Sequence, residues 1–321
     1  MENKKYFVVS DIHSFASELK YSLRQAGFNK RNKNHILIVC GDIFDRGDAT
    51  VEVYNYLKSI PKKRCILIKG NHESLYKELL TKSFPDRYDF SNGTVRAFCN
   101  IASIDEEKLS KYYWIEQGFA TGLDYDQIEE KLYSTWNQIK NIVANHEITA
   151  WLDSKQWINY FELDKYIFVH SFIPTKVKDE WKEMHPYKLR SFCYEYNPNW
   201  REASDDEWEL AAWGDPIDNF EYNLFKPEAD NGKVLIVGHW HTSDFYKRLE
   251  KVPTDTQEIY YSKNLIAVDG GVKYEPLLGY IHPQNVLIID GDNLYDRYYQ
   301  KLNYQDNHLL MYIQPYLIYV F

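Results

Sequence analysis

Five short apolar runs of this chain end in side chains of the kinds that bind metal ions or phosphate. Carboxylate, imidazole and amide groups are metal ligands, and the planar fork of an arginine matches phosphoryl oxygens. The sequence therefore indicates a site for a metal or a phosphate. The five endings are Asp11-Ile12-His13, Gly41-Asp42-Ile43-Phe44-Asp45-Arg46-Gly47, Gly70-Asn71-His72-Glu73, Val169-His170 and Gly238-His239-Trp240-His241.

The runs are typical of buried strands, because they are short and rich in β-branched residues. They cover residues 6–11, 36–42, 65–71, 166–171 and 234–239. Helical patterns at 17–27 and 50–60 separate the first three runs, with Gly27 and Pro61 as stop signals. This alternation predicts an α/β fold with a largely parallel sheet and helices outside it. In such sheets the site lies beyond the carboxyl ends of the strands, where the polar groups fall.

At these residues the sequence resembles the calcineurin-like metallophosphoesterases. The Asp45-Arg46-Gly47 and Gly70-Asn71-His72-Glu73 segments resemble the phosphoprotein phosphatase branch, which includes Ser/Thr phosphatases and diadenosine tetraphosphatases. The resemblance covers about residues 5–85 and 165–272, and its five elements follow the family's order. It implies a four-layer α/β/β/α sandwich with two facing sheets and a helical insertion.

The resemblance also implies a centre of two divalent metal ions. Asp11, His13 and Asp42 are then expected to hold the first metal, with Asp42 as the bridge and His241 joining them. The second metal is expected to be completed by Asn71, His170 and His239. Such a mixed ligand set favours Mn²⁺, with Fe, Zn, Co or Ni as alternatives, over Mg²⁺.

A hydroxide between the two metals is expected to attack phosphorus in line, without a phosphoenzyme. The resemblance makes His72 the general acid that protonates the leaving oxygen, oriented by Asp45. Arg46 is expected to clamp the phosphoryl oxygens. The segment 213–216 is expected to shape the substrate groove.

The sequence departs from the family pattern at two points that bear on the site. Ser14 stands where the family has a glycine after its first motif, so the first turn is expected to differ slightly. Residues 217–238 contain no second phosphate-binding arginine, and Arg201 or Lys226 is a candidate to replace it. Glu73 is expected either to support the metal ligands or to be structural, and residues 269–271 are expected to form a tight turn. The remaining histidines are expected to be surface or core residues: His35, His146, His185, His282 and His308.

We expect a single domain over residues 1–321, with 80–163 as a helical, aromatic-rich insertion. Helical spacing at 108–117 and 127–143 favours a packed helical cap over a platform that stacks bases. Residues 174–232 are predicted to be loop-like, and 264–299 to form strands and turns. The apolar residues 311–321 are predicted to be a packed terminal strand, with an interface or membrane-surface contact as the alternative.

Composition restricts the partners and the compartment. The chain of 321 residues is 44% hydrophobic and has a formal net charge of −9, which excludes disorder as its main state and disfavours long nucleic acid. No run approaches the ~20 apolar residues of a membrane helix. The cysteines form no CxxC pair, which indicates reduced core thiols in the cytoplasm. They are Cys40, Cys65, Cys99 and Cys193.

The expected function is hydrolysis of phosphomonoesters, with a Ser/Thr protein phosphatase-like activity on phosphorylated protein as the first hypothesis. A dinucleoside polyphosphate hydrolase is the alternative, and a phosphatase of nucleotides or RNA ends is a third. A catalytically silent, metal-binding regulatory protein is disfavoured, because His72, Asp45 and Arg46 serve only catalysis and all are present.

Overall fold

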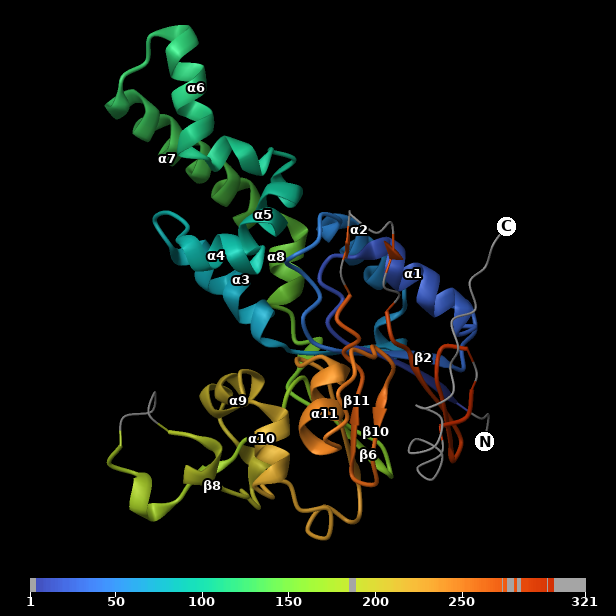
Figure 1. The fold of residues 1–321 in the computed structure, drawn as a ribbon. Helices are drawn as coiled ribbons and strands as arrows, with labels where there is room; N and C mark the ends of the chain where they lie inside the picture. Colours follow the sequence, from blue (N-terminus) through green and yellow to red (C-terminus); the bar gives the residue numbers. More distant parts are fainter. Residues whose placement is uncertain are drawn as a thin grey trace.

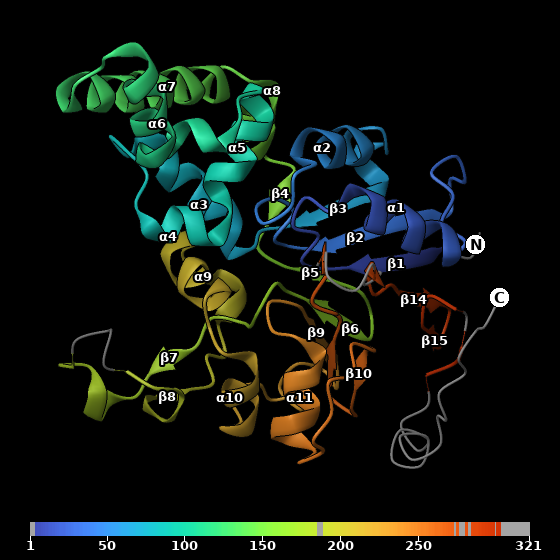
Figure 2. The same cartoon turned by 45° about the horizontal axis from the view of Figure 1, so that its top comes forward.

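Two β-sheets face each other, and helices cover the outer side of each (Figure 2). The predicted α/β fold with four α/β/β/α layers is therefore confirmed. The computed structural model describes residues 4–184, 189–272, 274–275, 280–281, 284–298 and 300–302. The terminal strand predicted at 311–321 lies outside the described residues, as do His185, His282 and His308.

The first sheet has the strand order β15-β14-β1-β2-β3-β4. Strands β1, β2, β3 and β4 are parallel, whereas β14 and β15 add two antiparallel strands at one edge. The bounds are β1 Lys5–Val9, β2 His35–Cys40, β3 Cys65–Ile68, β4 Trp157–Ile158, β14 Leu287–Asp290 and β15 Asn293–Tyr295.

The second sheet has the order β10-β11-β9-β6-β5. Its three central strands, β6, β9 and β11, are parallel, so their carboxyl ends lie at one edge. The bounds are β5 Phe161–Glu162, β6 Tyr166–Phe168, β9 Val234–Val237, β10 Tyr260–Tyr261 and β11 Leu265–Ala267.

Both faces of the first sheet are buried, which explains the continuous apolar runs of its strands. Alternate side chains of β1 and β2 point to opposite faces: Val8 and Ile38 pack against the second sheet, whereas Phe7 and Leu37 pack under the outer helices. Each such buried side chain contributes about 1.5–3 kcal/mol. The two facing sheets are therefore held rigidly, and the loops at their ends have fixed starting points.

Helices α1 and α2 cover the first sheet, and α9, α10 and α11 pack with the second (Figures 1 and 2). The predicted helix 17–27 ends before Gly27, which has a φ of +75°, and the predicted helix 50–60 ends before Pro61. The bounds are α1 Ala16–Gln25, α2 Thr50–Lys58, α9 Asp205–Ala212, α10 Pro216–Glu221 and α11 Thr242–Leu249.

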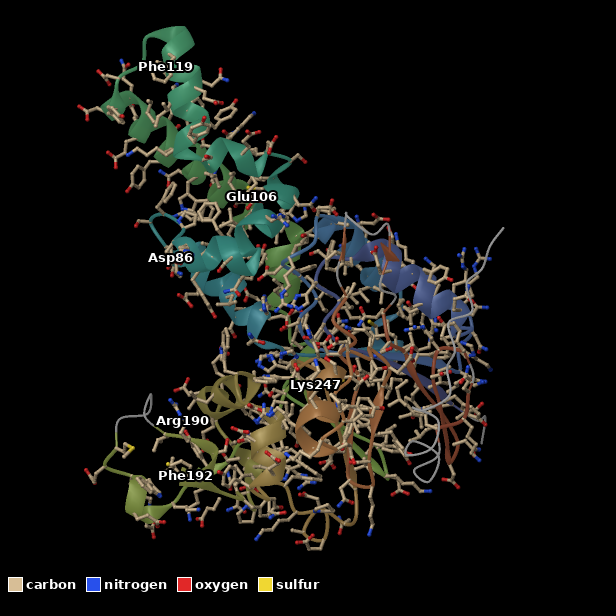
Figure 3. The ribbon with its side chains drawn as sticks, viewed as in Figure 1. Asp86, Glu106, Phe119, Arg190, Phe192 and Lys247 are labelled. Atoms are coloured by element: carbon tan, nitrogen blue, oxygen red, sulfur yellow. The ribbon has the colours of Figure 1, made fainter. Side chains whose placement is uncertain are left out.

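A run of six helices separates β3 from β4, and α6 and α7 extend from it as an arm (Figure 1). Phe119, which is 87% exposed, lies near the outer end of this arm (Figure 3). The helices predicted at 108–117 and 127–143 are confirmed in type and approximate position. The bounds are α3 Asn71–Thr81, α4 Arg87–Asn92, α5 Thr94–Ala102, α6 Lys111–Thr121, α7 Tyr125–Ala144 and α8 Glu147–Leu152.

The boundaries proposed for this insertion need adjustment. Residue 80 lies inside α3, and the helical part ends at Leu152. The segment up to 163 is not part of the arm, because β4 pairs with β3 and β5 pairs with β6. Strand pairing between residues 90 positions apart, Leu67 and Trp157, is not visible in local sequence patterns.

The loop-like prediction for 174–232 is wrong in part, because α9 and α10 lie there together with β7 (Lys176–Val177) and β8 (Tyr194–Glu195). The start signals are local: the Ser204 hydroxyl accepts a hydrogen bond from Glu207 N, and Pro216 follows the cap Asp215. Among the described residues of 264–299, strands and turns are confirmed, and they include β12 (Tyr274–Glu275) and β13 (Tyr280–Ile281).

Two further predictions concern the cysteines and membranes. All four cysteines are buried and free, as expected for core thiols. Among the described residues, the structure contains no helix with the length and apolar character needed to span a bilayer.

Candidate metal centre

The structure brings the five strand endings together at the carboxyl edges of the two sheets. The loops after β1, β2, β3, β6 and β9 carry these residues, and most of their side chains are almost completely buried. Burial of so many polar groups has a high desolvation cost unless they share partners or a ligand. Those at or below 3% exposure are Asp11, His13, Asp42, Asp45, Asn71, His72 and His170.

The Asp42 carboxylate lies at the centre of the site. Its Oδ2 is 3.7 Å from His13 Nε2, and its Oδ1 is 3.3 Å from His170 Nε2. Two groups of potential metal ligands share this residue, and within each group the ligand atoms lie within 4.8 Å of one another. One group is His13, Asp42 and His72; the other is Asp42, His170 and His239. A bridging role for Asp42 is consistent with this placement.

The ring of His13 is held in one orientation. Its Nδ1 lies 3.0 Å from the carbonyl oxygen of Phe44, which can only accept, so Nδ1 carries the proton. The remaining nitrogen, Nε2, then presents a lone pair, and it is buried without a hydrogen-bond partner. A buried lone pair that faces carboxylates fits a cation, which would supply the missing partner.

His170 has the same arrangement on the other side of Asp42. Its Nδ1 donates to the Cys40 carbonyl over 2.8 Å, and its Nε2 lies 2.8 Å from Asn71 Oδ1 and 3.2 Å from His239 Nδ1. These atoms are typical metal ligands. Ligand atoms about 2.1 Å from one cation lie roughly 3.0–3.4 Å apart, so the observed spacing fits a metal position.

Asp11 and His241 belong to neither of the two ligand groups found among the described residues. Asp11 Oδ1 is 3.8 Å from His13 Nε2, and its Oδ2 accepts a hydrogen bond from His239 N over 2.9 Å. His241 is half-buried, immediately precedes α11 and lines a hollow beside Arg46. Its ring belongs to neither ligand group among the described residues.

The pKa values at the site follow from this crowding. Burial raises the pKa of Asp11 to about 6, a shift that Asp42 increases and His170 opposes. Burial also opposes ionisation of Asp42, but the charges of His170, His72 and His13 hold its pKa well below the usual range. Asp42 is therefore the group that stays anionic, as a bridging ligand must.

The histidines of the two ligand groups also differ in the direction of their pKa shifts. Burial and the charges on Arg46 and His72 lower the pKa of His13 well below its usual value. Burial and the charge on His170 lower the pKa of His239 to about 3. For His170, burial acts downward, yet Asp42 and Asp11 raise its pKa. A metal bound at His170 Nε2 would have to displace any proton on that nitrogen.

His72 and Asp45 form a close pair beside Asp42. His72 Nδ1 is 2.7 Å from Asp45 Oδ2, and its Nε2 is 3.7 Å from Asp42 Oδ2. Burial opposes the charged form of His72, but Asp42 and Asp45 outweigh it and raise its pKa to about 9. Arg46 Nη2 lies 3.5 Å from His72 Nε2. An imidazolium and a guanidinium thus meet at one point of the site, where a phosphate ester with its leaving oxygen could be received.

The loops that carry these groups have an unusual backbone. Left-handed φ values occur at seven non-glycine residues of the site loops, including 54° at Asp42 and 67° at His239. Gly238 packs so closely on the loop after β1 that a Cβ there would lie 1.6 Å from Ser10 Oγ. Such conformations persist only where the surrounding structure holds them, and they concentrate at functional sites.

Ser14 keeps a glycine-like conformation, with a φ of 60°, and its hydroxyl lies 2.9 Å from Thr50 Oγ1. The expected difference at the first turn is therefore an added hydrogen bond. Glu73 accepts hydrogen bonds from the backbone N–H groups of Asp42, Ile43 and Gly70 at 2.7–3.1 Å. It holds the loop after β2 against the loop after β3, in agreement with its predicted structural role.

The candidates for a second phosphate-binding arginine are engaged elsewhere. Arg201 binds Glu162 and the buried Asp230 at 2.7 and 2.8 Å, and it lies over the Trp200 ring. Lys226 lies 5.8 Å from the centre of the Tyr196 ring. These contacts therefore do not support Arg201 or Lys226 as the replacement for the second phosphate-binding arginine.

The remaining residues that the sequence analysis singled out make structural contacts. Asp215 caps α10 and binds Arg248 over 2.8 Å, which fixes the 213–216 segment. His146 Nδ1 accepts from Ile148 N at the start of α8, and His35 begins β2. Asp269 Oδ1 accepts from Gly271 N in the predicted tight turn.

Two hollows flank the centre. One, of about 190 Å³, lies between α3 and α9 and includes Gly70, His170 and Trp208. The other, of about 740 Å³, lies beside the start of α1 and includes Arg46, Arg96 and His241. Arg96 belongs to the helical insertion and was not predicted, because no local pattern links it to residues about 50 positions earlier.

Residues 4–243 match the family described as calcineurin-like phosphoesterase, which is more than half of the chain. The chain therefore belongs to this family, and the resemblance found in the strand endings is confirmed.

Curated relatives match parts of the chain. It is 38% identical over 84 residues to Shewanella-like protein phosphatase 1 of Plasmodium berghei, covering 23% of each chain. It is 28% identical over 172 residues to the symmetrical bis(5'-nucleosyl)-tetraphosphatase of Buchnera aphidicola, covering 49% of this chain and 60% of that one. It is 36% identical over 86 residues to serine/threonine-protein phosphatase 7 of Arabidopsis thaliana, covering 23% and 20%. The chain thus spans at most 60% of the length of these relatives.

Solved structures match the chain at low identity. A cold-active protein-tyrosine phosphatase of a psychrophilic Shewanella species is 15% identical with a TM-score of 0.44, over 94% of this chain and 80% of that chain. A protein serine/threonine phosphatase from Saccharomyces cerevisiae is 12% identical with a TM-score of 0.41, over 91% and 74%. At TM-scores below 0.5 these likenesses do not bear on the substrate.

Proposed function

We propose that this protein hydrolyses phosphoesters with the help of two divalent cations held on either side of Asp42. The observation that carries the proposal is the shared carboxylate between two sets of inward-facing lone pairs, including the unpartnered Nε2 of His13. Membership of the calcineurin-like phosphoesterase family supports the same reaction class.

In this proposal Asp11, His13 and Asp42 hold the first cation, with His241 beside them. Asp42, Asn71, His170 and His239 hold the second cation. Mn²⁺ is the proposed metal, because the set mixes imidazole nitrogens with carboxylate and amide oxygens. Bound cations would polarise the phosphate and activate a water molecule as the nucleophile.

The chain's own groups then handle the phosphate and the leaving group. Arg46, which is exposed and reaches His72, binds phosphoryl oxygens through its planar fork. His72 gives its Nε2 proton to the leaving oxygen, so the alcohol departs neutral, and Asp45 holds the ring through Nδ1. His72 is assigned as an acid because Asp45 holds its ring through Nδ1, which leaves Nε2 to carry the transferable proton, although Nε2 lies near enough to Asp42 to compete as a ligand.

The first proposed substrate class is a phosphorylated Ser or Thr side chain of a protein. Similarity to relatives named as protein phosphatases supports it. Dinucleoside polyphosphates are the second class, since similarity to a bis(5'-nucleosyl)-tetraphosphatase extends over 49% of the chain. A cytoplasmic location is proposed as well, supported by four free, buried cysteines.

The test is phosphate release by metal-depleted protein reloaded with Mn²⁺. A phosphoserine peptide, diadenosine tetraphosphate and a nucleoside monophosphate are assayed in parallel, with Asp42→Asn as the blank. We expect Mn²⁺-dependent release that is fastest with the phosphopeptide. Faster cleavage of diadenosine tetraphosphate would replace the first substrate class by the second. No release from any of them by the Mn²⁺-loaded protein would contradict the proposed reaction.

A further inference from the structure

The loop that carries Asp45 and Arg46 is held by one helix of the insertion. Arg96 Nη1 in α5 donates to the Arg46 carbonyl over 2.9 Å. Asn100, one turn further along α5, accepts from Val51 N over 3.2 Å and donates to the Asp48 carbonyl. Figure 3 places Glu106 beside the same helix, where it binds Arg96 Nε over 2.9 Å. The α5 helix therefore contacts this loop along its length.

The contact nearest to the chemistry is made by Thr94, the first residue of α5. Its hydroxyl donates to Asp45 Oδ2 over 2.6 Å, and this same oxygen is 2.7 Å from His72 Nδ1. Thr94 and Asp45 are both 0% exposed, so water does not compete for the carboxylate. Asp45 Oδ1 has no hydrogen-bond partner. The Thr94 hydroxyl is thus the second of the two contacts that fix the rotation of this carboxylate.

Gly93 allows α5 to start so close to the loop. Its φ is +79°, and a Cβ at this position would lie 2.3 Å from Arg46 N. The loop itself is strained there, with φ values of 73° at Asp45 and 56° at Arg46. A left-handed backbone at non-glycine residues needs support from its surroundings, and the start of α5 supplies it.

We propose that Thr94 is a positioning residue of the reaction, which acts by fixing the Asp45 carboxylate and, through it, the ring of His72. The proposal rests on the proposed phosphoester hydrolysis. It gives the helical insertion a part in catalysis in addition to its packing. The effect of Thr94 is expected wherever the leaving oxygen needs a proton from His72.

Leaving-group dependence separates this role from a merely structural one. p-Nitrophenolate is stable as an anion and leaves without a proton, whereas the phenolate of phenyl phosphate needs one. Loss of ring orientation at His72 therefore slows phenyl phosphate more than p-nitrophenyl phosphate. A general loosening of the fold or loss of metal slows both substrates alike.

The experiment compares Thr94→Val, which removes the hydroxyl at nearly constant volume, with Thr94→Ser, which keeps it. Thr149→Val is the matched control: its hydroxyl donates to the Val143 carbonyl in the same insertion and lies 2.9 Å from the Tyr76 hydroxyl, so its hydrogen bonds are to residues other than Asp45 and His72. Folding and bound Mn²⁺ are measured for each Mn²⁺-loaded protein. If Thr94→Val does not fold, Thr94→Ala, which leaves space instead of filling it, replaces it.

We expect Thr94→Val to lower kcat for phenyl phosphate about tenfold, because a tenfold change corresponds to the free energy of one hydrogen bond. The kcat for p-nitrophenyl phosphate is expected to fall by less than about twofold. Thr94→Ser and Thr149→Val remain within about twofold of the wild type. In an Asp45→Asn background, Thr94→Val has no further effect.

Four results would overturn the role of Thr94. They are an equal loss of kcat on the two substrates, no loss at all, no rescue by Thr94→Ser, and an additive effect with Asp45→Asn. Absence of Mn²⁺-dependent turnover of either substrate by the wild type would instead overturn the proposed function, and the Thr94 proposal with it.

Discussion

On one side of the Asp42 carboxylate, His170 Nε2 lies 2.8–3.3 Å from three other ligand atoms. On the other side, His13 Nε2 lies 3.7 and 3.8 Å from the carboxylate oxygens of Asp42 and Asp11. The first spacing is close to that of atoms around one cation, whereas the second is wider than the roughly 3.0–3.4 Å expected. The two halves of the centre therefore differ in how completely they are formed without a metal.

The difference follows from where the ligands come from. The closer half is built from Asn71 at the start of α3 and from His170 and His239, which follow two neighbouring parallel strands. The wider half takes Asp11 and His13 from the single loop after β1, and it also faces the His72 ring, 4.8 Å from that of His13. We infer that the His170 side binds its cation more tightly than the His13 side.

Asp42→Asn is expected to have the largest effect, because it removes the anion that both halves share. Loss of the metals removes several kcal/mol of transition-state stabilisation, so the rate of phosphate release should fall at least about 10,000-fold. Both Mn²⁺ equivalents should be lost or weakened together, as measured by isothermal titration. Retention of full activity would show that Asp42 does not bridge the two halves.

His72→Asn tests whether the ring beside the wider half is an acid or a ligand. As an acid, its loss should lower kcat about 10²–10⁴-fold while both Mn²⁺ equivalents stay bound. Metal content by atomic absorption and turnover of an alkyl phosphate give the two readouts. Loss of one Mn²⁺ equivalent in the folded variant would make His72 a metal ligand and move the acid role elsewhere.

Single ligand variants should separate the halves themselves. His170→Ala is expected to remove the tighter class of Mn²⁺ binding, and His13→Ala the weaker class, each by about 100-fold or more in affinity. Mn²⁺ titration followed by calorimetry distinguishes the classes. If His13→Ala removed the tighter class instead, the wider half would have to close fully around its metal, and the inferred order of the two affinities would be wrong.

The smallest expected effect concerns pH. In the metal-free protein the pKa of Asp11 is raised to about 6, so Asp11 carries a proton below that pH and the metal must displace it. Affinity of the wider half should therefore rise with pH up to about 6, by up to roughly tenfold per unit for one displaced proton. Mn²⁺ titrations between pH 5 and 7 measure the slope, and an affinity independent of pH would contradict the shift.

Much of the centre could be predicted from sequence, because each ligand directly follows a strand whose apolar run is readable by itself. The loops after β1, β2, β3, β6 and β9 meet because their strands are parallel within facing sheets. The alternation of strands and helices predicts the parallel sheet, and the family resemblance implies the two facing sheets. The 3.7 Å approach of both His13 and His72 to Asp42 was not predictable, since it depends on loop conformation.

The contribution of the insertion could not be predicted for a different reason. Thr94 lies 49 residues after Asp45 in the chain, and no spacing rule connects a helix start with a strand end at that distance. Arg201 was a reasonable candidate for binding phosphate until the structure placed it beside Glu162 and Asp230. Charge alone does not reveal whether an arginine already has partners.

The most direct test of the account is a crystal structure of the protein soaked with Mn²⁺, with the metals located by their anomalous scattering. We predict two peaks about 3.5–4 Å apart, one on each side of the Asp42 carboxylate, with the stronger peak beside His170. A single peak, or metal bound away from Asp42, would contradict the two-cation centre.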